Sequence, residues 1–146
     1  MGEVVDAVRI AEPTEWNVVF HKTSTSRLLS FLAFGDFKHV SAFGYCVGFR
    51  AWVVYDVTWW GTRVWLADKA AIIAATRNCT IVRFPRTDRR MGMSSRLGLY
   101  CVTGVKHLLR LRCVAATPDQ LYRHILRNGG VDIGSGQPAP APADAA

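Results

Sequence analysis

Apolar and polar positions alternate with the period of a β-strand in several short runs of this chain. These runs are rich in aromatic and β-branched residues, which favour strands. The expected strands span 15–20, 37–45, 49–57, 63–67 and 80–84. Gly48 lies in the short turn between the second and third runs, so this pair is predicted to form an antiparallel hairpin.

A helical period replaces the alternation elsewhere in the chain. The expected helices span 27–34, 69–77, 100–111 and 118–127. The last has clear end signals, because Thr117 is a candidate N-cap, Pro118 takes the first helical position and Gln120 completes a capping-box pattern. The order of elements predicts an α+β fold, with a small antiparallel β-sheet packed against helices.

One domain accounts for most of the chain. Its 146 residues, half of them hydrophobic, are enough to bury a single globular core. We expect a lead-in over 1–15, a single α+β domain over 16–130, and a tail over 131–146. The tail is rich in Gly, Pro and Ala, which cannot build a core, and it is predicted to be disordered.

The net charge of +7 is concentrated in one part of the sequence. Residues 81–128 hold ten Lys and Arg residues against two acids, Asp88 and Asp119. Such a region predicts either a solvated basic face or a site for an anionic partner. The candidate anion-binding or partner-binding residues, in a predicted basic loop over 86–96, are Arg86, Arg89, Arg90 and Arg96. Aromatic residues are sparse there, so nucleic acid is not the favoured partner.

The chain shows no secretory signal and no transmembrane segment. Its most apolar region, 42–60, is interrupted by Arg50 and Asp56 and fits two strands better than a membrane helix. We therefore expect a cytoplasmic or phage-virion protein. The spacing of the cysteines indicates reduced thiols, and no metal or cofactor is expected. Three of them, Cys46, Cys79 and Cys113, are predicted to be packing residues.

The fourth cysteine, Cys101, is the candidate nucleophile. It lies in the first turn of the helix expected over 100–111, where unpaired backbone N–H groups and the helix dipole favour a thiolate. Helical spacing places Val105 and Leu108 on the same face, and the Cys101 backbone N–H is suited to an oxyanion hole. A buried structural cysteine is the alternative explanation of the same pattern.

A cysteine nucleophile needs a histidine base and a group that orients it. His107 is six residues further along the helix and therefore points elsewhere. His39 begins a predicted strand, and the hairpin places Asp56 opposite His39 to Ser41. An acid in an otherwise apolar strand is less costly if it accepts a hydrogen bond from His39. A structural histidine and a strand-end acid remain the alternatives.

This order of residues resembles the circularly permuted papain-like fold, which includes NlpC/P60-like, YiiX-like and lecithin:retinol acyltransferase-like proteins. In that group a strand and a helix precede a His-Val strand, as in His39-Val-Ser-Ala-Phe43, and the cysteine opens a helix, as in Tyr100-Cys101-Val102. The resemblance implies a bacterial or phage cysteine hydrolase or acyltransferase with a triad of Cys101, His39 and Asp56.

The implied substrates are amides or esters in peptides, peptidoglycan or lipid acyl groups, and virion proteins are possible partners. The alternative function is a catalytically silent phage or bacterial structural module. Its basic 81–128 face would then bind a protein or nucleic acid.

Overall fold

The computed structural model describes residues 13, 15–23, 35–85 and 100–135. The helix predicted over 27–34 and the basic loop over 86–96, with all four of its candidate arginines, lie outside the described residues. The same is true of nearly all of the predicted lead-in and of residues 136–146.

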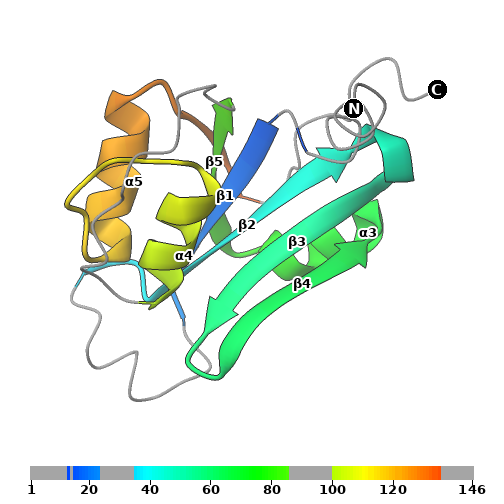
Figure 1. The fold of residues 1–146 in the computed structure, drawn as a ribbon, viewed down its shortest axis with the longest axis horizontal. Coiled ribbons are helices and arrows are strands. Elements are labelled where there is room, and N and C mark those ends of the chain that lie inside the picture. The colour runs from blue at the N-terminus through cyan, green and yellow to red at the C-terminus, as the bar shows by residue number, and fades with distance from the viewer. Residues whose placement is uncertain (1–12, 14, 24–34, 86–99, 136–146) are drawn as a thin grey trace, which may run out of the picture.

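Six antiparallel strands form one twisted sheet in the order β4-β3-β2-β1-β5-β6 (Figure 1). The strands are β1 (Glu15–His21), β2 (His39–Cys46), β3 (Ala51–Thr58), β4 (Gly61–Ala67), β5 (Cys79–Pro85) and β6 (Val131–Gly134). A short 3-10 turn, η1 (Val47–Phe49), closes the β2–β3 hairpin at the predicted turn. The five predicted strands are therefore all present.

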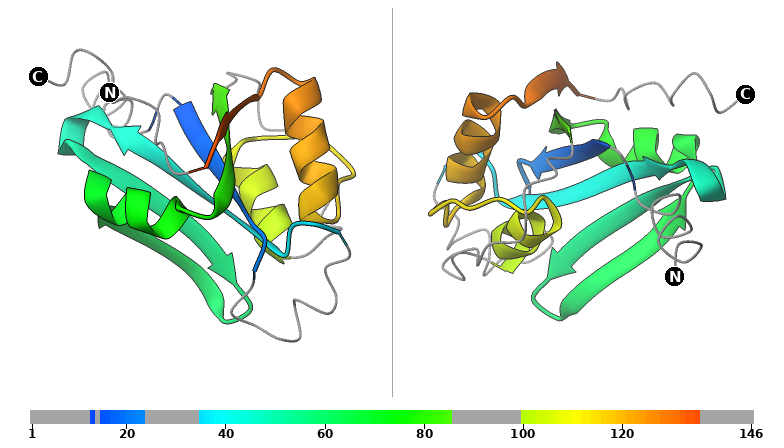
Figure 2. Two further views of the ribbon diagram at one scale, coloured as in Figure 1. Left: turned by 180° about the vertical axis from the view of Figure 1, so that it is seen from behind. Right: turned by 45° about the horizontal axis from the view of Figure 1, so that its top comes forward.

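In the described part of the chain, three helices cover the sheet from two sides. They are α3 (Lys69–Thr76), α4 (Tyr100–Leu108) and α5 (Pro118–Arg127). Helices α4 and α5 lie together on one face, and α3 lies on the other, as the reversed view in Figure 2 shows. The α+β fold class predicted from the sequence is thus confirmed. No helix among the described residues is long and apolar enough to span a bilayer.

The two faces of the sheet bury two separate hydrophobic cores. Alternate residues of a strand point to opposite faces, so β1, β2 and β5 each contribute buried residues to both cores. The core under α4 and α5 includes Val18, Phe20, Val40, Ala42, Val102, Val105, Leu121 and Ile125. The core under α3 includes Val19, Phe43, Trp52, Ile72 and Ile81.

Helix α4 is shorter than the sequence predicts. Arg110 adopts a left-handed conformation with φ of 55°, and the Leu111 N–H donates to the Lys106 carbonyl. This backbone arrangement ends the helix as a Schellman-type cap does, here without glycine. Helix α5 begins as predicted, because Thr117 and Gln120 form a reciprocal capping box and Pro118 stands at the first helical position.

The predicted domain boundary at residue 130 is wrong, because the next four residues are part of the sheet. Val131–Gly134 forms β6, which pairs with the free edge of β5. Asp132 holds this segment through hydrogen bonds from the Tyr122 hydroxyl (2.7 Å) and the Gly134 N–H (2.8 Å). Edge pairing satisfies backbone groups and needs little apolar side-chain surface, so the composition of this segment did not indicate a strand.

Candidate active site

Polar side chains gather at one end of the sheet. In this antiparallel arrangement β1 and β3 end there, and β2 and β5 begin there. His21 lies opposite His39 on β2 and opposite Cys79 on β5. Asp56 lies opposite Ser41, so the predicted hairpin register is confirmed. Residues in directly opposed positions share a face of the sheet and contact one another.

His39 is held by a carboxylate that is itself held by an arginine. The His39 Nε2 lies 2.7 Å from Asp56 Oδ1, and the Arg63 guanidinium donates to Asp56 Oδ2 at 3.0 Å. The side chains of His39 and Asp56 are only 18% and 12% exposed, whereas Arg63 is 66% exposed. Both carboxylate oxygens are therefore occupied, which fixes the orientation of the imidazole ring.

Cys101 is brought to the same end of the sheet by α4. The start of this helix lies against the β3–β4 turn, where the rings of Trp59 and Tyr100 meet edge to face at 5.3 Å. Cys101 is in the first turn, is 6% exposed, and interacts electrostatically with His39, which raises the pKa of that ring. Asp56 occupies the Nε2 atom of His39, so Nδ1 is the ring nitrogen available to the Cys101 sulfur.

A glycine allows α4 to pack this closely on the sheet. A Cβ atom at Gly104 would collide with the Val57 side chain and would also lie 3.3 Å from the Tyr55 hydroxyl. Gly104 is one turn from Cys101, so the same close approach positions the thiol.

The electrostatics of the site favour a protonated His39. Burial lowers the pKa of His39, but the hydrogen bond that its ring donates to Asp56 and its electrostatic interactions with Asp56 and Cys101 outweigh burial and raise the pKa to about 9. Burial raises the pKa of Asp56, but His39 and Arg63 more than offset this and hold it below its usual range. At neutral pH the site therefore contains an imidazolium between a carboxylate and a sulfur atom.

A second cysteine–histidine pair lies beside the first. His21 Nδ1 is 3.2 Å from Cys79 Sγ, and His21 Nε2 is 2.8 Å from Ser41 Oγ. Burial and the positive charge of His39 lower the pKa of His21 to about 4, although Asp56 partly offsets them. Burial also raises the pKa of the Cys79 thiol. This pair is therefore uncharged at neutral pH.

Local sequence does not indicate this second pair. His21 comes directly after the strand expected over 15–20, and Cys79 is predicted to be a packing residue. The only available signal was that each stands at the end of a strand, and their contact depends on the pairing of β1 with β5. Among the described residues, no group of three or more His, Cys, Asp or Glu side chains is arranged to hold a metal ion.

Comparison of the chain with protein-family models, with curated proteins and with solved structures finds no match.

Proposed function

We propose that this protein is a cysteine hydrolase or acyltransferase in which Cys101 is the nucleophile, His39 the acid–base and Asp56 the positioning residue. The observation that carries the proposal is the interaction of a helix-start thiol with an imidazole that a buried carboxylate orients. The combination of nucleophile, base and orienting group is the geometric requirement for covalent acyl transfer.

The first half-reaction acylates the cysteine. The positive charge of His39 beside the sulfur favours the thiolate. The thiolate attacks the carbonyl carbon of an amide or ester and forms a carbon–sulfur bond. The tetrahedral intermediate then expels the amine or alcohol, which takes the proton from His39, and a thioester on Cys101 remains.

The second half-reaction releases the acyl group. His39, now neutral, takes a proton from water or from an acceptor alcohol or amine, whose oxygen or nitrogen attacks the thioester carbonyl. The carbon–sulfur bond breaks and returns the thiolate. Asp56 keeps the ring oriented through Nε2 and stabilises the imidazolium in both steps.

The second pair supports the choice of Cys101 over Cys79. The Cys79 thiol keeps its proton at neutral pH, because burial raises its pKa and its neighbour His21 is neutral. A protonated thiol is a poor nucleophile. Cys79 also starts a strand, so it has no helix N-terminus to favour a thiolate.

A test of the proposal is to trap the acyl-enzyme. The purified chain is incubated with p-nitrophenyl esters of short and long acids, and adducts are located by intact mass and peptide mapping. We expect one thioester on Cys101, its loss in Cys101→Ala, and acylation about 10²-fold slower in His39→Gln. His21→Gln is the matched control and keeps the adduct.

The proposal fails if the adduct forms equally in Cys101→Ala, or if no ester or amide probe acylates the folded chain. In that event the catalytically silent binding module, with its basic 81–128 face, is the better description.

A further inference from the structure

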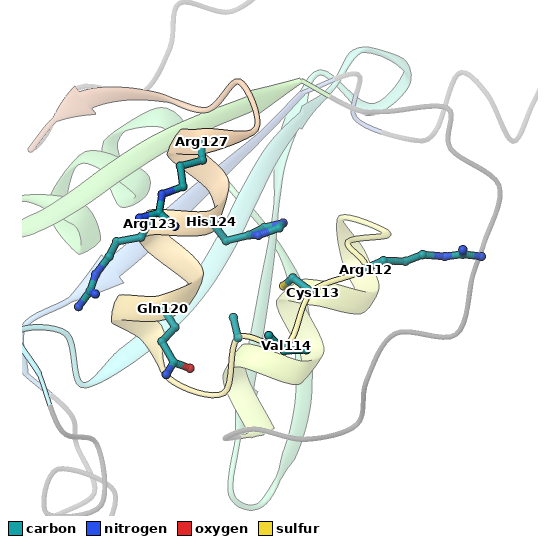
Figure 3. Close-up of a pocket in the computed structure, with 8 residues that line it drawn as sticks. Arg112, Cys113, Val114, Gln120, Arg123, His124 and Arg127 are labelled. Atoms are coloured by element: carbon teal, nitrogen blue, oxygen red, sulfur yellow. The ribbon is translucent and has the colours of Figure 1, made fainter.

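A pocket of about 550 Å³ lies between α5 and the segment that connects α4 to α5 (Figure 3). Its walls are Arg112, Cys113, Val114, Ala115, Gln120, Arg123, His124 and Arg127. This volume is within the range of sites that hold small molecules. None of the wall residues belongs to the candidate active site.

The pocket carries positive charge that the described carboxylates do not neutralise. Arg112, Arg123 and Arg127 form no ion pair with an acid in the described part of the chain. The acid within α5, Asp119, and the next acid along the chain, Asp132, are held elsewhere. Asp119 accepts hydrogen bonds from the N–H groups of Asp36 and Phe37.

Asp132, the second of these acids, accepts a hydrogen bond from the Tyr122 hydroxyl at 2.7 Å and one from the Gly134 N–H. It is therefore engaged at the start of β6, and it is not among the residues that line the pocket. The lining residues thus include three arginines and no acid, and the Arg112 side chain extends away from Arg123 and Arg127 (Figure 3).

A buried lysine lies beneath the wall. Lys106 is fully buried, and its Nζ donates to the carbonyl of Ala115, a wall residue, at 3.0 Å. Burial and the positive charges of Lys106 and Arg127 lower the pKa of His124. The Asn128 amide also lies against its ring, 3.4 Å from Nε2. A neutral His124 thus stands among cations.

We propose that this pocket binds the phosphate group of a small phosphate-bearing ligand. Guanidinium groups match phosphate oxygens with paired hydrogen bonds, and Arg123 and Arg127, one turn apart on α5, are the two arginines placed to bind one phosphate group together. The pocket is a partly open depression of about 550 Å³, a size that suits a compact ligand better than an extended polymer. The inference is independent of the proposed acyl-transfer function.

The test is a calorimetric titration of the full chain with inorganic diphosphate at fixed, low ionic strength. We expect one saturable site per chain and an affinity at least tenfold lower in the double variant Arg123→Gln, Arg127→Gln. Both arginines are exposed, so these changes preserve the fold. Arg77→Gln, an exposed arginine at the end of α3, is the matched control and leaves the affinity unchanged.

A second readout places the ligand in this pocket. Bound phosphate beside His124 must raise the pKa of this ring, which NMR titration with and without diphosphate measures. Absence of saturable binding, equal loss of affinity in Arg77→Gln, or an unchanged His124 titration would overturn the proposal.

Two further probes separate the possible sources of phosphate. An orthophosphate titration that competes with diphosphate supports a free phosphate group as the ligand. Vesicles containing phosphatidic acid, bound through the same two arginines and displaced by diphosphate, support a lipid headgroup. Retention of a duplex or single-stranded oligonucleotide without any diphosphate binding overturns the pocket in favour of a nucleic-acid surface.

Discussion

His21 and His39 lie directly opposite each other on β1 and β2, with ring centroids 5.3 Å apart, yet only His39 is protonated at neutral pH. Asp56 and Cys101 stabilise the charge of His39, and that charge in turn disfavours a second one on His21. One cysteine–histidine pair is therefore charged and the other neutral, although they share one end of the sheet.

The two histidines must titrate far apart. NMR titration of the imidazole protons is expected to give a pKa of about 9 for His39 and about 4 for His21. In His39→Gln the pKa of His21 rises, because the neighbouring charge that lowers it is gone. Ordinary values near 6.5 for both rings would contradict the structure.

Stability depends on pH through both rings. The pKa of His39 is higher in the folded state than its ordinary 6.5, so its contribution, up to about 3 kcal/mol, is complete below pH 6.5 and lost as pH rises through 9. His21 has a lowered pKa, so the fold loses stability as pH falls from 6.5 to 4.

Urea unfolding across pH 4 to 10 measures both effects. The stability difference between the wild type and His39→Gln shrinks above pH 6.5, and His21→Gln removes part of the loss below it. If the free energy of unfolding changes with pH in the opposite directions, the assigned directions of the His39 and His21 pKa shifts are wrong.

Alkylation distinguishes the two cysteine–histidine pairs. With iodoacetamide at pH 7, His39→Gln is expected to slow modification of Cys101 by at least about tenfold, because the imidazolium beside the sulfur is lost. His21→Gln is expected to leave the Cys101 rate unchanged. Cys113, which is half-buried and outside both pairs, serves as the internal control. Equal Cys101 rates in the wild type and His39→Gln would count against the proposed nucleophile.

Asp56 and Arg63 are expected to differ in importance. Asp56→Asn removes the buried carboxylate, so acylation of Cys101 falls by about 10²-fold and the pKa of His39 drops towards its ordinary value. Arg63→Gln removes a mostly exposed partner and lowers the rate less than about tenfold. Ester-probe kinetics together with the His39 titration measure both variants, and equal losses would contradict this ranking.

Gly104 controls the distance between α4 and the sheet. In Gly104→Ala the new Cβ collides with Val57, so α4 moves outward, the protein loses about 1–3 kcal/mol of stability and Cys101 loses contact with His39. Thermal unfolding and the His39 titration report the two effects separately. Adding Val57→Ala relieves the collision and is expected to restore part of both. If Val57→Ala restores neither the stability nor the His39 titration, crowding against Val57 is not the cause of the losses in Gly104→Ala.

The predictable part of this structure comes from local sequence. Alternation and helical period placed five strands and the helices at 69–77, 100–111 and 118–127, because these patterns reflect which face of an element is buried. The turn at Gly48 set the β2–β3 register, and that register brought Asp56 opposite Ser41 and next to His39. The position of Cys101 at a helix start also follows from local sequence.

Local sequence thus accounts for the first five strands, the positions of α3, α4 and α5, the β2–β3 hairpin and the choice of three candidate site residues. The pairing of β1 with both β2 and β5 depends on tertiary contacts, and it brings His21 and Cys79 together beside His39. Tertiary contacts also add β6 to the sheet and place α5 beside the 112–115 segment, where the basic pocket lies. These contacts join segments far apart in the chain through backbone pairing and shared burial, which leave no periodic signal in either segment alone.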